Sequence, residues 1–488
     1  MVKKESPGPI GEVTPSRESE YKERSRLVQK ALVDDGLYTE PGSEKVPQGN
    51  DLWRISPEPF WLEPGEVRYL EQLGQHLLKF YQGINHLYFE SLKDRQPRWI
   101  SEYLHLGKPE PLIEYGRMNR FKTSLPGVIR PDLLPSETGM VATELDSVPG
   151  GIGITGSLGQ HYTRLGYQIA GGPNGMIEGF AKMVQHLTDE PVQRTAIVVS
   201  EESRPYRSEM RWVADRLTRH GLKTLLLEPK EVVFTEEHLL AEHDNELLPI
   251  DVLYRFFELF DLKNIPKAEL ILYSARKERV LITPPIKTYL EEKMSFAFLH
   301  HPVLEPFWQQ ELGDETFRLL KQLIPQTWIL DSRPLPPYGL IPNLHLGTRP
   351  VTAWQELARA SQKERQFVIK PSGFSELAWG SRGVTVGHDL SQEDWAKALN
   401  NALESFDQTP YILQDYRKGR KYTVNYYDPM ADSVKTMEGR VRLSPYYFVQ
   451  NEKAVLGGVL ATICPIEKKL IHGMVEAVMA PCGVRSHA

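Results

Sequence analysis

Apolar residues recur at steps of three and four between Trp53 and Ser101, which is the pattern of one buried helix face. This stripe comprises Tyr69, Leu70, Leu73, Leu77, Leu78 and Tyr81. The preceding residues 1–50 are rich in Pro, Gly, Ser, Glu and Lys. They bury too little apolar surface to offset the entropy lost on ordering, so we expect a disordered arm in which only residues 20–33 can form a short helix.

From Val128 to Ser147 the apolar period changes to two, which predicts a β-hairpin. The next predicted elements follow in the order strand, helix, strand, strand and strand, at residues 195–199, 208–220, 223–227, 250–254 and 279–282. Strand, helix and strand at this spacing form a βαβ unit with parallel pairing. Residues 191–332 are therefore expected to form a Rossmann-like α/β domain.

The last third of the chain follows a Pro-, Gly- and Leu-rich boundary at residues 333–350. Short strands are predicted there at residues 367–370, 383–386, 411–414, 422–427 and 439–443. The turn signals between them predict a largely antiparallel sheet. The expected fold class is α+β with a parallel α/β insert, with units at residues 1–50, 51–190, 191–332 and 333–488.

Composition and charge narrow the range of functions. The chain has 488 residues, with 58 Lys and Arg against 64 Asp and Glu, a net charge of −6. It lacks the positive charge of a protein that binds nucleic acid or anionic membranes. Its two cysteines, Cys464 and Cys482, exclude a disulfide framework or a thiolate zinc site. Since no apolar run approaches the ~20 residues of a membrane span, we expect a cytoplasmic protein with neither nucleic-acid nor membrane partners.

The predicted hairpin carries the first candidate chemistry. Arg130 and Asp132 are two apart on one strand, and Glu144 and Asp146 are two apart on the other. Side chains two apart share a face of the sheet, so all four can converge. Such an oxygen-rich face suits Mg²⁺ held between protein and phosphates. The alternative is a solvated hairpin face with an incidental ion pair.

A glycine motif follows the hairpin directly. Gly151, Gly153 and Gly156 match G-x-G-x-x-G. A dinucleotide fingerprint also needs an acidic residue about 20 positions later, at the end of a second strand. The nearest candidate, Glu178, lies in a helical pattern. A tight loop beside an active site or a structural turn is therefore favoured, and an NAD(P)-dependent oxidoreductase is the weaker alternative.

Basic residues of the last third are candidates for binding phosphate. Lys370 stands at the end of an apolar strand, where it can meet phosphate oxygens as a point charge. The loop after it, which carries Arg382, can fold backbone N–H groups over them. Arg440 and Arg442 share one strand face and suit phosphate or acyl-phosphate oxygens. The alternative for Lys370 is a lysine that extends from an edge strand into solvent, and the alternative for Arg440 and Arg442 is a solvated strand face.

Taken together, these motifs resemble the ATP-grasp superfamily, in the arrangement of glutathionylspermidine synthetase and related circularly permuted proteins. The resemblance rests first on Arg130-Pro-Asp132 and Glu144-Leu-Asp146, which match R-x-D…E-x-N in order and in the twelve-residue step between Asp132 and Glu144. Asp146 stands where the family often has Asn, and both side chains offer oxygen to a metal.

Three further stretches extend the resemblance. Residues 251–258 are similar to the D-x-x-Y-R-R segment, with Phe256 in place of the second Arg. Residues 367–373 resemble the strand that bears the ATP lysine, and residues 412–416 resemble the hinge that holds adenine. The second ATP lysine is not placed by any motif. Lys421 is a candidate, although it follows the hinge instead of preceding it.

The resemblance implies an ATP-grasp-like fold with mixed and antiparallel sheets around a nucleotide cleft. Residues 51–190 would comprise a helical segment and the metal-binding hairpin of the core, and residues 333–488 the nucleotide-binding domain. Only the synthetase part is expected, without an amidase domain. The implied activity is that of an ATP-dependent ligase, which joins a small carboxylate to an amine through an acyl phosphate.

The resemblance also assigns roles to residues. The implied Mg²⁺ ligands are Asp132, Glu144 and Asp146. The implied catalytic residues are Arg130, Arg440 and Arg442. The implied ATP-binding residues are Lys370, Ser372, Gly373, Arg382, Gln414, Asp415 and Tyr416. Because the second lysine is not placed, a non-catalytic nucleotide-binding protein of the same fold is the main alternative. The acid, the amine and the oligomeric state stay open.

Overall fold

The computed structural model describes residues 15–39, 52–243, 245–333, 339–468 and 476–485. Its largest sheet runs in the order β18-β1-β21-β20-β19-β3-β4, with β2 paired to β21. The strands are β1 (Arg54–Ile55), β2 (Phe60–Leu62), β3 (Val128–Ser136), β4 (Gly139–Asp146), β18 (Lys421–Asp428), β19 (Ser433–Gln450), β20 (Lys453–Pro465) and β21 (Val478–Val484). The sheet is antiparallel except where β1 and β2 run parallel to β21. It therefore joins strands from both sides of the boundary expected near residue 333, while the division into units stays a prediction.

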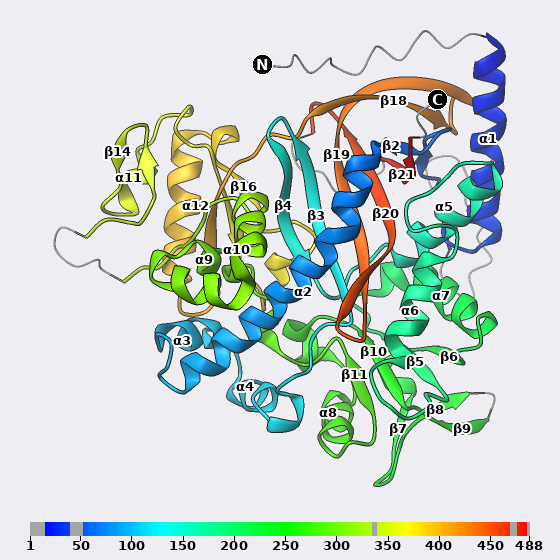
Figure 1. Ribbon diagram of the computed structural model, residues 1–488, viewed down its shortest axis with the longest axis horizontal. Helices are drawn as coiled ribbons and strands as arrows, with labels where there is room; N and C mark the ends of the chain where they lie inside the picture. Colours follow the sequence, from blue (N-terminus) through cyan, green and yellow to red (C-terminus); the bar gives the residue numbers. More distant parts are fainter. Residues whose placement is uncertain (1–14, 40–51, 244, 334–338, 469–475, 486–488) are drawn as a thin grey trace.

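Helices cover both faces of this sheet. Tyr447 and Phe448 are neighbours on β19, so their rings point to opposite faces. A Cβ on Gly74 of α2 (Pro64–Leu92) would lie 2.4 Å from the Tyr447 ring, and one on Gly179 of α6 (Gly175–Gln185) 2.4 Å from the Phe448 ring. The long helix α2 thus lies against one face, and α6 lies against the other with α5 (Ile152–Arg164) beside it (Figure 1).

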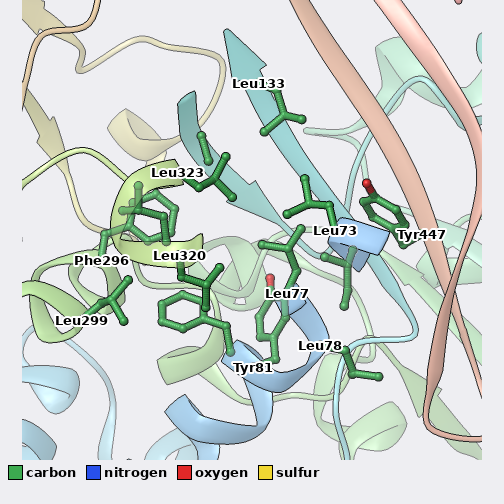
Figure 2. Packing of buried hydrophobic residues seen from close by; sticks show 14 of the residues in the cluster. Leu73, Leu77, Leu78, Tyr81, Leu133, Phe296, Leu299, Leu320, Leu323 and Tyr447 are labelled. Atoms are coloured by element: carbon green, nitrogen blue, oxygen red, sulfur yellow. The ribbon is translucent and has the colours of Figure 1, made fainter. Parts of the chain in front are cut away.

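The main hydrophobic core fills the space between α2 and the sheet. The predicted apolar stripe of α2 packs there, with Tyr69 partly buried, and Figure 2 shows Leu73 and Leu77 in one cluster with Leu133 of β3 and Tyr447 of β19. The core is completed by α9 (Met294–His300) and α10 (Glu305–Leu323), which bring Phe296, Leu320 and Leu323 onto the same cluster. This packing fixes the hairpin of β3 and β4, because Leu133 of β3 is part of the cluster.

The parallel sheet expected in the insert is present. Strands β5 (Thr195–Val199), β6 (Thr224–Leu227), β10 (Val252–Phe256) and β11 (Leu281–Thr283) pair in the order β11-β10-β5-β6, all parallel. The helix between β5 and β6 is α7 (Arg207–Arg219), and α8 (Ala268–Arg276) lies between β10 and β11. A small antiparallel sheet of β7 (Val232–Phe234), β8 (Leu239–His243) and β9 (Glu246–Pro249) extends from it.

A third antiparallel sheet carries the predicted phosphate-binding strand. It runs β12-β17-β15-β16, with β12 (Thr327–Ile329), β15 (Phe367–Pro371), β16 (Thr385–Val386) and β17 (Tyr411–Asp415). Its own core is closed by α11 (Gln355–Ala358) and α12 (Gln392–Glu404), next to the hairpin of β13 (His345–Leu346) and β14 (Arg349–Pro350). In Figure 1 this unit lies on the opposite side of the large sheet from α5 and α7.

The prediction of a disordered arm over residues 1–50 is wrong for part of it. Residues 15–34 form α1, on which Tyr21, Val28 and Leu32 are buried. The short helix expected at residues 20–33 is thus longer, and Val28 and Leu32 pack into the cluster that also holds residues of α5 and α7. Residues 1–14 and 40–50 of the expected arm lie outside the described residues.

The fold class follows the expectation in outline, since parallel and antiparallel sheets combine with helices on both faces of the largest sheet. The remaining helices are α3 (Trp99–His105) and α4 (Glu110–Gly116). In the described parts of the chain, no helix has both the length and the apolar composition that a membrane-spanning segment requires.

Candidate functional site

A cavity of about 570 Å³ lies where the large sheet, the parallel insert and the third sheet meet. The hairpin contributes Arg130, Asp132, Glu144 and Asp146 to its wall. Other walls come from residues 150–151, from Glu258, Glu291 and Lys293, from the loop 373–381 and from Arg442 of β19. Charged groups from four distant stretches of the chain therefore share one space.

The hairpin register brings the predicted residues together. Arg130 lies opposite Asp146, and Asp132 lies opposite Glu144, so the prediction of a shared face is confirmed. The register shifts between Asp132 and Leu133, which leaves Thr143 as the extra residue of a β-bulge. A bulged residue is unpaired in the ladder, so the Thr143 carbonyl is open to another partner.

Asp132 is contacted by two arginines and a hydroxyl group. Its carboxylate lies 3.2 Å from Arg130 Nε and 3.1 Å from Arg442 Nη1, and it accepts a hydrogen bond from Ser444 Oγ at 3.1 Å. The side chain is 5% exposed. Asp132 therefore holds the two arginines in place, and its role as a metal ligand stays a prediction.

Glu144 is paired with a lysine that no motif had indicated. Lys293 Nζ lies 2.7 Å from Glu144 Oε1 and also donates to the Ala378 carbonyl at 3.3 Å. Burial alone would raise the pKa of Glu144, but Lys293, followed by Lys370 and Arg130, lowers that pKa to about 2. Glu144 is therefore a carboxylate at any ordinary pH, and Lys293 stays cationic because Glu144 raises its pKa against the effect of burial.

Lys370 lies behind the hairpin and not on the cavity wall. Its Nζ donates to the carbonyl of the bulged Thr143 at 3.0 Å and to Gln414 Oε1 at 3.0 Å. Burial lowers the pKa of Lys370 to about 8, although Glu144 counteracts this. The predicted residues Lys370 of β15 and Gln414 of β17 are thus in direct contact. Lys370 also contacts the hairpin at Thr143, the residue before Glu144.

Two further carboxyl groups, Glu258 and Glu291, line the cavity together with Asp146 of the hairpin. Burial raises the pKa of Glu258 to about 8, with added repulsion from Glu291 and Asp146. Burial and neighbouring carboxylates likewise raise the pKa values of Asp146 and Glu291, although Arg130 and Arg255 offset part of this effect. Glu291 pairs with the buried Arg255. The cavity thus holds more carboxyl groups than cations, and the raised pKa values favour the protonated form of these three groups.

The glycine motif is not a dinucleotide fingerprint, so this alternative is wrong. It follows β4, an edge strand paired antiparallel with β3, whereas the fingerprint needs a parallel βαβ unit. The N-terminus of α5 is already occupied, because Gly151 N and Gly153 N donate to the buried Glu209 carboxylate at 2.7 and 3.2 Å. Gly156 is needed for helix packing, since a Cβ there would lie 2.8 Å from the Trp212 ring.

The predicted ATP-binding residues Ser372 and Gly373 differ in position: Gly373 lines the cavity, and Ser372 does not. Ser372 Oγ donates to the buried Glu292 and accepts from Met294 N at 2.9 Å, so this hydroxyl is committed to holding α9. Glu292 in turn pairs with Lys108 at 2.6 Å, and both side chains are essentially fully buried. Gly373 begins the loop that lines the cavity.

The remaining predicted residues lie outside the cavity wall. Arg382 pairs with Glu202 at 3.1 Å and stacks on Trp379. Arg440 donates to the Ile466 carbonyl at 2.9 Å. The hinge candidates Asp415 and Tyr416 use their backbone N–H groups within the third sheet, on the Gln326 and Gln366 carbonyls. Lys421 is exposed on β18, also away from the cavity wall.

The donor set fits a magnesium ion only in part. Within the described ranges, no three His, Cys, Asp or Glu side chains gather closely enough to hold a metal ion by themselves. Mg²⁺ at a phosphate site needs only one or two carboxylates, with phosphates and water completing its shell. Glu144 and Asp146 line the cavity and are 35% and 30% exposed, so these two can serve in that way.

Lys293, Glu258 and Glu209 were missed by the motif analysis. Lys293 stands in Glu291-Glu292-Lys293, a cluster that resembles an ordinary solvated turn. The apolar run directly after it, Met294 to Leu299, was the available signal that this turn is buried. Glu209 lies on the amphipathic α7, where nothing in the sequence distinguishes it from a surface glutamate.

Comparison with known proteins identifies a structure of similar fold but does not assign the chain to a family. No protein-family model matches the chain, and no curated protein matches it either. A solved structure of a glutathione synthetase-like effector, GSS30 from Globodera pallida in its apo form, matches with a TM-score of 0.57 and 12% identity, over 96% of this chain and 98% of that one. The two chains therefore share a fold over almost their whole length.

A second solved structure, a putative γ-glutamylcysteine synthetase from Methylobacillus flagellatus KT, matches with a TM-score of 0.39 and 13% identity. It covers 83% of this chain and 84% of that one. This similarity is too low to carry an argument. The mixed α/β architecture with parallel and antiparallel sheets is thus that of a synthetase-like fold, on the strength of the first match.

Proposed function

We propose that the chain is an ATP-dependent ligase that joins a small carboxylic acid to an amine in this cavity. The observation that carries the proposal is the meeting of Lys293 and Lys370 on the β3–β4 hairpin, with Lys293 on Glu144 and Lys370 on Thr143. Lys293 comes from the insert and Lys370 from the third sheet, so two cations converge beside an acidic wall. That pairing suits a polyphosphate chain with a divalent cation.

The proposed reaction has two steps. The γ-phosphoryl group of ATP passes to a carboxylate oxygen of the acid, which releases ADP and leaves an acyl phosphate. The amine nitrogen then attacks the carbonyl carbon, phosphate leaves, and the amine loses a proton. Glu258 lines the cavity with a pKa raised to about 8 by burial, so it is mostly protonated at neutral pH and its carboxylate form can accept this proton as the pH approaches 8.

The side chains of the cavity would act mainly by position and charge. Lys293, on the cavity wall, would contact the phosphates, and Lys370 would add its positive charge from behind the hairpin. Arg130 and Arg442, held by Asp132, would stabilise charge at the acyl phosphate. The loop 373–381 would exclude water from this intermediate. Glu144 and Asp146 would hold Mg²⁺, which when bound neutralises phosphate charge. Arg440 and Arg382 have no part in this proposal.

ADP release with hydroxylamine as the amine tests the proposal, because hydroxylamine traps acyl phosphates as hydroxamates. With an acid that supports turnover, Lys293→Ala should lower the rate by on the order of 10²-fold or more. Lys421→Ala is the matched control, since this exposed lysine lies away from the cavity wall and should leave the rate unchanged. Wild-type turnover in folded Lys293→Ala would remove Lys293 from the reaction.

A non-catalytic nucleotide-binding protein of the same fold is the second candidate. It is favoured by the internal contacts of Lys370 with Thr143 and Gln414, and by the commitment of Ser372 to Glu292. Both groups already have partners within the protein. Binding of Mg-ATP without ADP release, for every acid and amine offered, would favour this candidate over the ligase.

A further inference from the structure

One end of the cavity is apolar. It is lined by Leu37 after α1, Trp53 before β1, Ile154 of α5, Leu460 of β20 and Met479 of β21. These residues belong to a single hydrophobic cluster, in which Leu37, Leu460 and Met479 are 2%, 6% and 8% exposed. The charged residues of the cavity lie on the hairpin, on Glu258 and Glu291, around Lys293, and at Arg442, whose guanidinium is paired with Asp132.

This apolar end offers little to a charged ligand. Among the described lining residues, the carboxylate next to it is Glu209, which is 2% exposed and committed to the backbone N–H groups of Gly151 and Gly153. Ser208 Oγ donates to the Leu37 carbonyl at 3.1 Å. A charged group placed there would lose its hydration without gaining a partner, which is unfavourable.

Arg130 stands between the apolar end and the acidic wall. Its Nη1 donates to the Gly150 carbonyl at 3.3 Å, and Tyr446 Oη donates to the same carbonyl at 2.7 Å. Its Nη2 lies 3.1 Å from Asp146 on the other side. A ligand that reaches from the apolar end into the charged region therefore passes a guanidinium on its way.

We propose that the acid substrate is a monocarboxylic acid with an uncharged apolar tail, such as a medium-chain alkanoic or arylalkanoic acid. This inference rests on the proposed function for its chemical step. The tail occupies the end formed by Leu37, Trp53, Leu460 and Met479, and the carboxylate lies at Arg130, facing the hairpin. Amino-acid-like or dicarboxylic acids are disfavoured, because their second charge would enter the apolar end.

Equilibrium binding to the full-length protein, measured by calorimetry without nucleotide, tests this assignment apart from turnover. Octanoate and glutarate are the probes, since they share a carboxylate and differ in what lies at the other end. Burial of the alkyl chain should make octanoate bind tighter by on the order of a hundredfold. Equal affinities, or tighter binding of glutarate, would overturn the inference.

Two variants on one strand locate the tail. Leu460 and Val459 are both buried on β20, but successive residues face opposite sides, and Val459 belongs to the core cluster beneath α2. Leu460→Thr should weaken octanoate binding roughly tenfold, and Val459→Thr should leave it unchanged. If Leu460→Thr does not fold, Ile154→Thr replaces it, since this half-buried residue lines the same end. Unchanged octanoate binding in the folded variant would overturn the placement of the tail.

The ADP assay with the same acids separates the two proposals. Selective binding of octanoate with no ADP release for any acid would refute the ligase and keep the assignment of the apolar end. ADP release and hydroxamate formation with glutarate in preference to octanoate would keep the ligase and refute the tail. Turnover of octanoate in preference to glutarate supports both.

Discussion

Lys293 Nζ lies 2.7 Å from the Glu144 carboxylate and joins the segment before α9 to the end of the β3–β4 hairpin. Its two preceding neighbours pair in other directions, Glu291 with Arg255 and Glu292 with Lys108. Three consecutive charged residues thus connect the hairpin, the parallel insert and the segment before α4. Such a set of ion pairs fixes Lys293 relative to the cavity without any metal or nucleotide.

Replacement of Lys293 by Met should raise the pKa of Glu144 from about 2 towards its ordinary value of 4.5. The wild-type ion pair stabilises the fold fully above pH 4.5, and this contribution is lost as the pH falls towards 2. At pH 7 the variant should lose about 1–2 kcal/mol of unfolding free energy, less than for a fully buried pair because Glu144 is 35% exposed. A carboxyl NMR titration and urea unfolding at pH 7 measure both effects. An unchanged Glu144 pKa would contradict the pairing.

Asp132→Asn and Asp146→Asn should separate a structural carboxylate from a ligand-binding one. Asp132 is 5% exposed and bridges Arg130 and Arg442, so its neutralisation should cost about 3–5 kcal/mol of stability. Asp146 is 30% exposed, and its pKa is raised by burial, so its neutralisation should cost little. Thermal unfolding compares the two variants. Equal stability would contradict the assignment of Asp132 as the residue that holds the arginines.

The hairpin was predictable because its side chains obey a local rule. Alternation along two strands puts Arg130, Asp132, Glu144 and Asp146 on one face, and the register of β3 and β4 follows from the turn between them. The strands of the parallel insert were predictable for a similar reason, since continuous apolar runs such as residues 195–199 fit buried parallel strands.

Lys293 and Glu258 were not predictable, because their roles depend on contacts between distant segments. Lys293 meets Glu144 across about 150 positions of chain, and nothing local distinguishes it from an exposed lysine. Arg382 and Arg440 are the converse case, and their functional roles stay predictions. Each lies in a sequence that suits phosphate binding. In the folded protein, however, Arg382 forms an ion pair with Glu202, and Arg440 donates a hydrogen bond to the Ile466 carbonyl.

Glu258→Gln should make the protein more stable at alkaline pH. The folded-state pKa of Glu258 is about 8, above its ordinary 4.5, so the wild type loses stability as the pH rises from about 4.5 to 8. The amide carries no charge and removes this loss. At pH 8 the variant should exceed the wild type by about 3–4 kcal/mol, with no gain near pH 4.5. Urea unfolding across this pH range measures it. A gain of equal size at both ends would show an effect other than titration.

Arg382→Ala should leave the affinity for Mg-ATP unchanged within about twofold, since its guanidinium pairs with Glu202 outside the cavity wall. The pair is 48% and 35% exposed, so its loss should cost at most about 1 kcal/mol of stability. Calorimetric titration with Mg-ATP, with Lys293→Ala as the sensitive comparison, measures the difference. A tenfold loss of affinity in Arg382→Ala would return this residue to the phosphate site.

Lys108→Met tests whether the ion pair beneath Lys293 supports the cavity. Lys108 and Glu292 are 0% and 1% exposed, so loss of the cation leaves a buried carboxylate with Ser372 as its other partner. Stability should fall by about 3–5 kcal/mol. The double variant Lys108→Met, Glu292→Leu should recover most of this loss, because apolar residues of similar volume often replace a buried pair without cost.

The same double variant separates stability from position. Glu292 also accepts from Ser372, the residue whose hydroxyl binds Met294 N directly after Lys293. If the pair positions Lys293, the double variant should recover its melting temperature and still show a raised Glu144 pKa in a carboxyl NMR titration, because Lys293 would no longer be held on Glu144. If the Glu144 pKa stays at about 2 in the stable double variant, the pair between Lys108 and Glu292 serves folding alone.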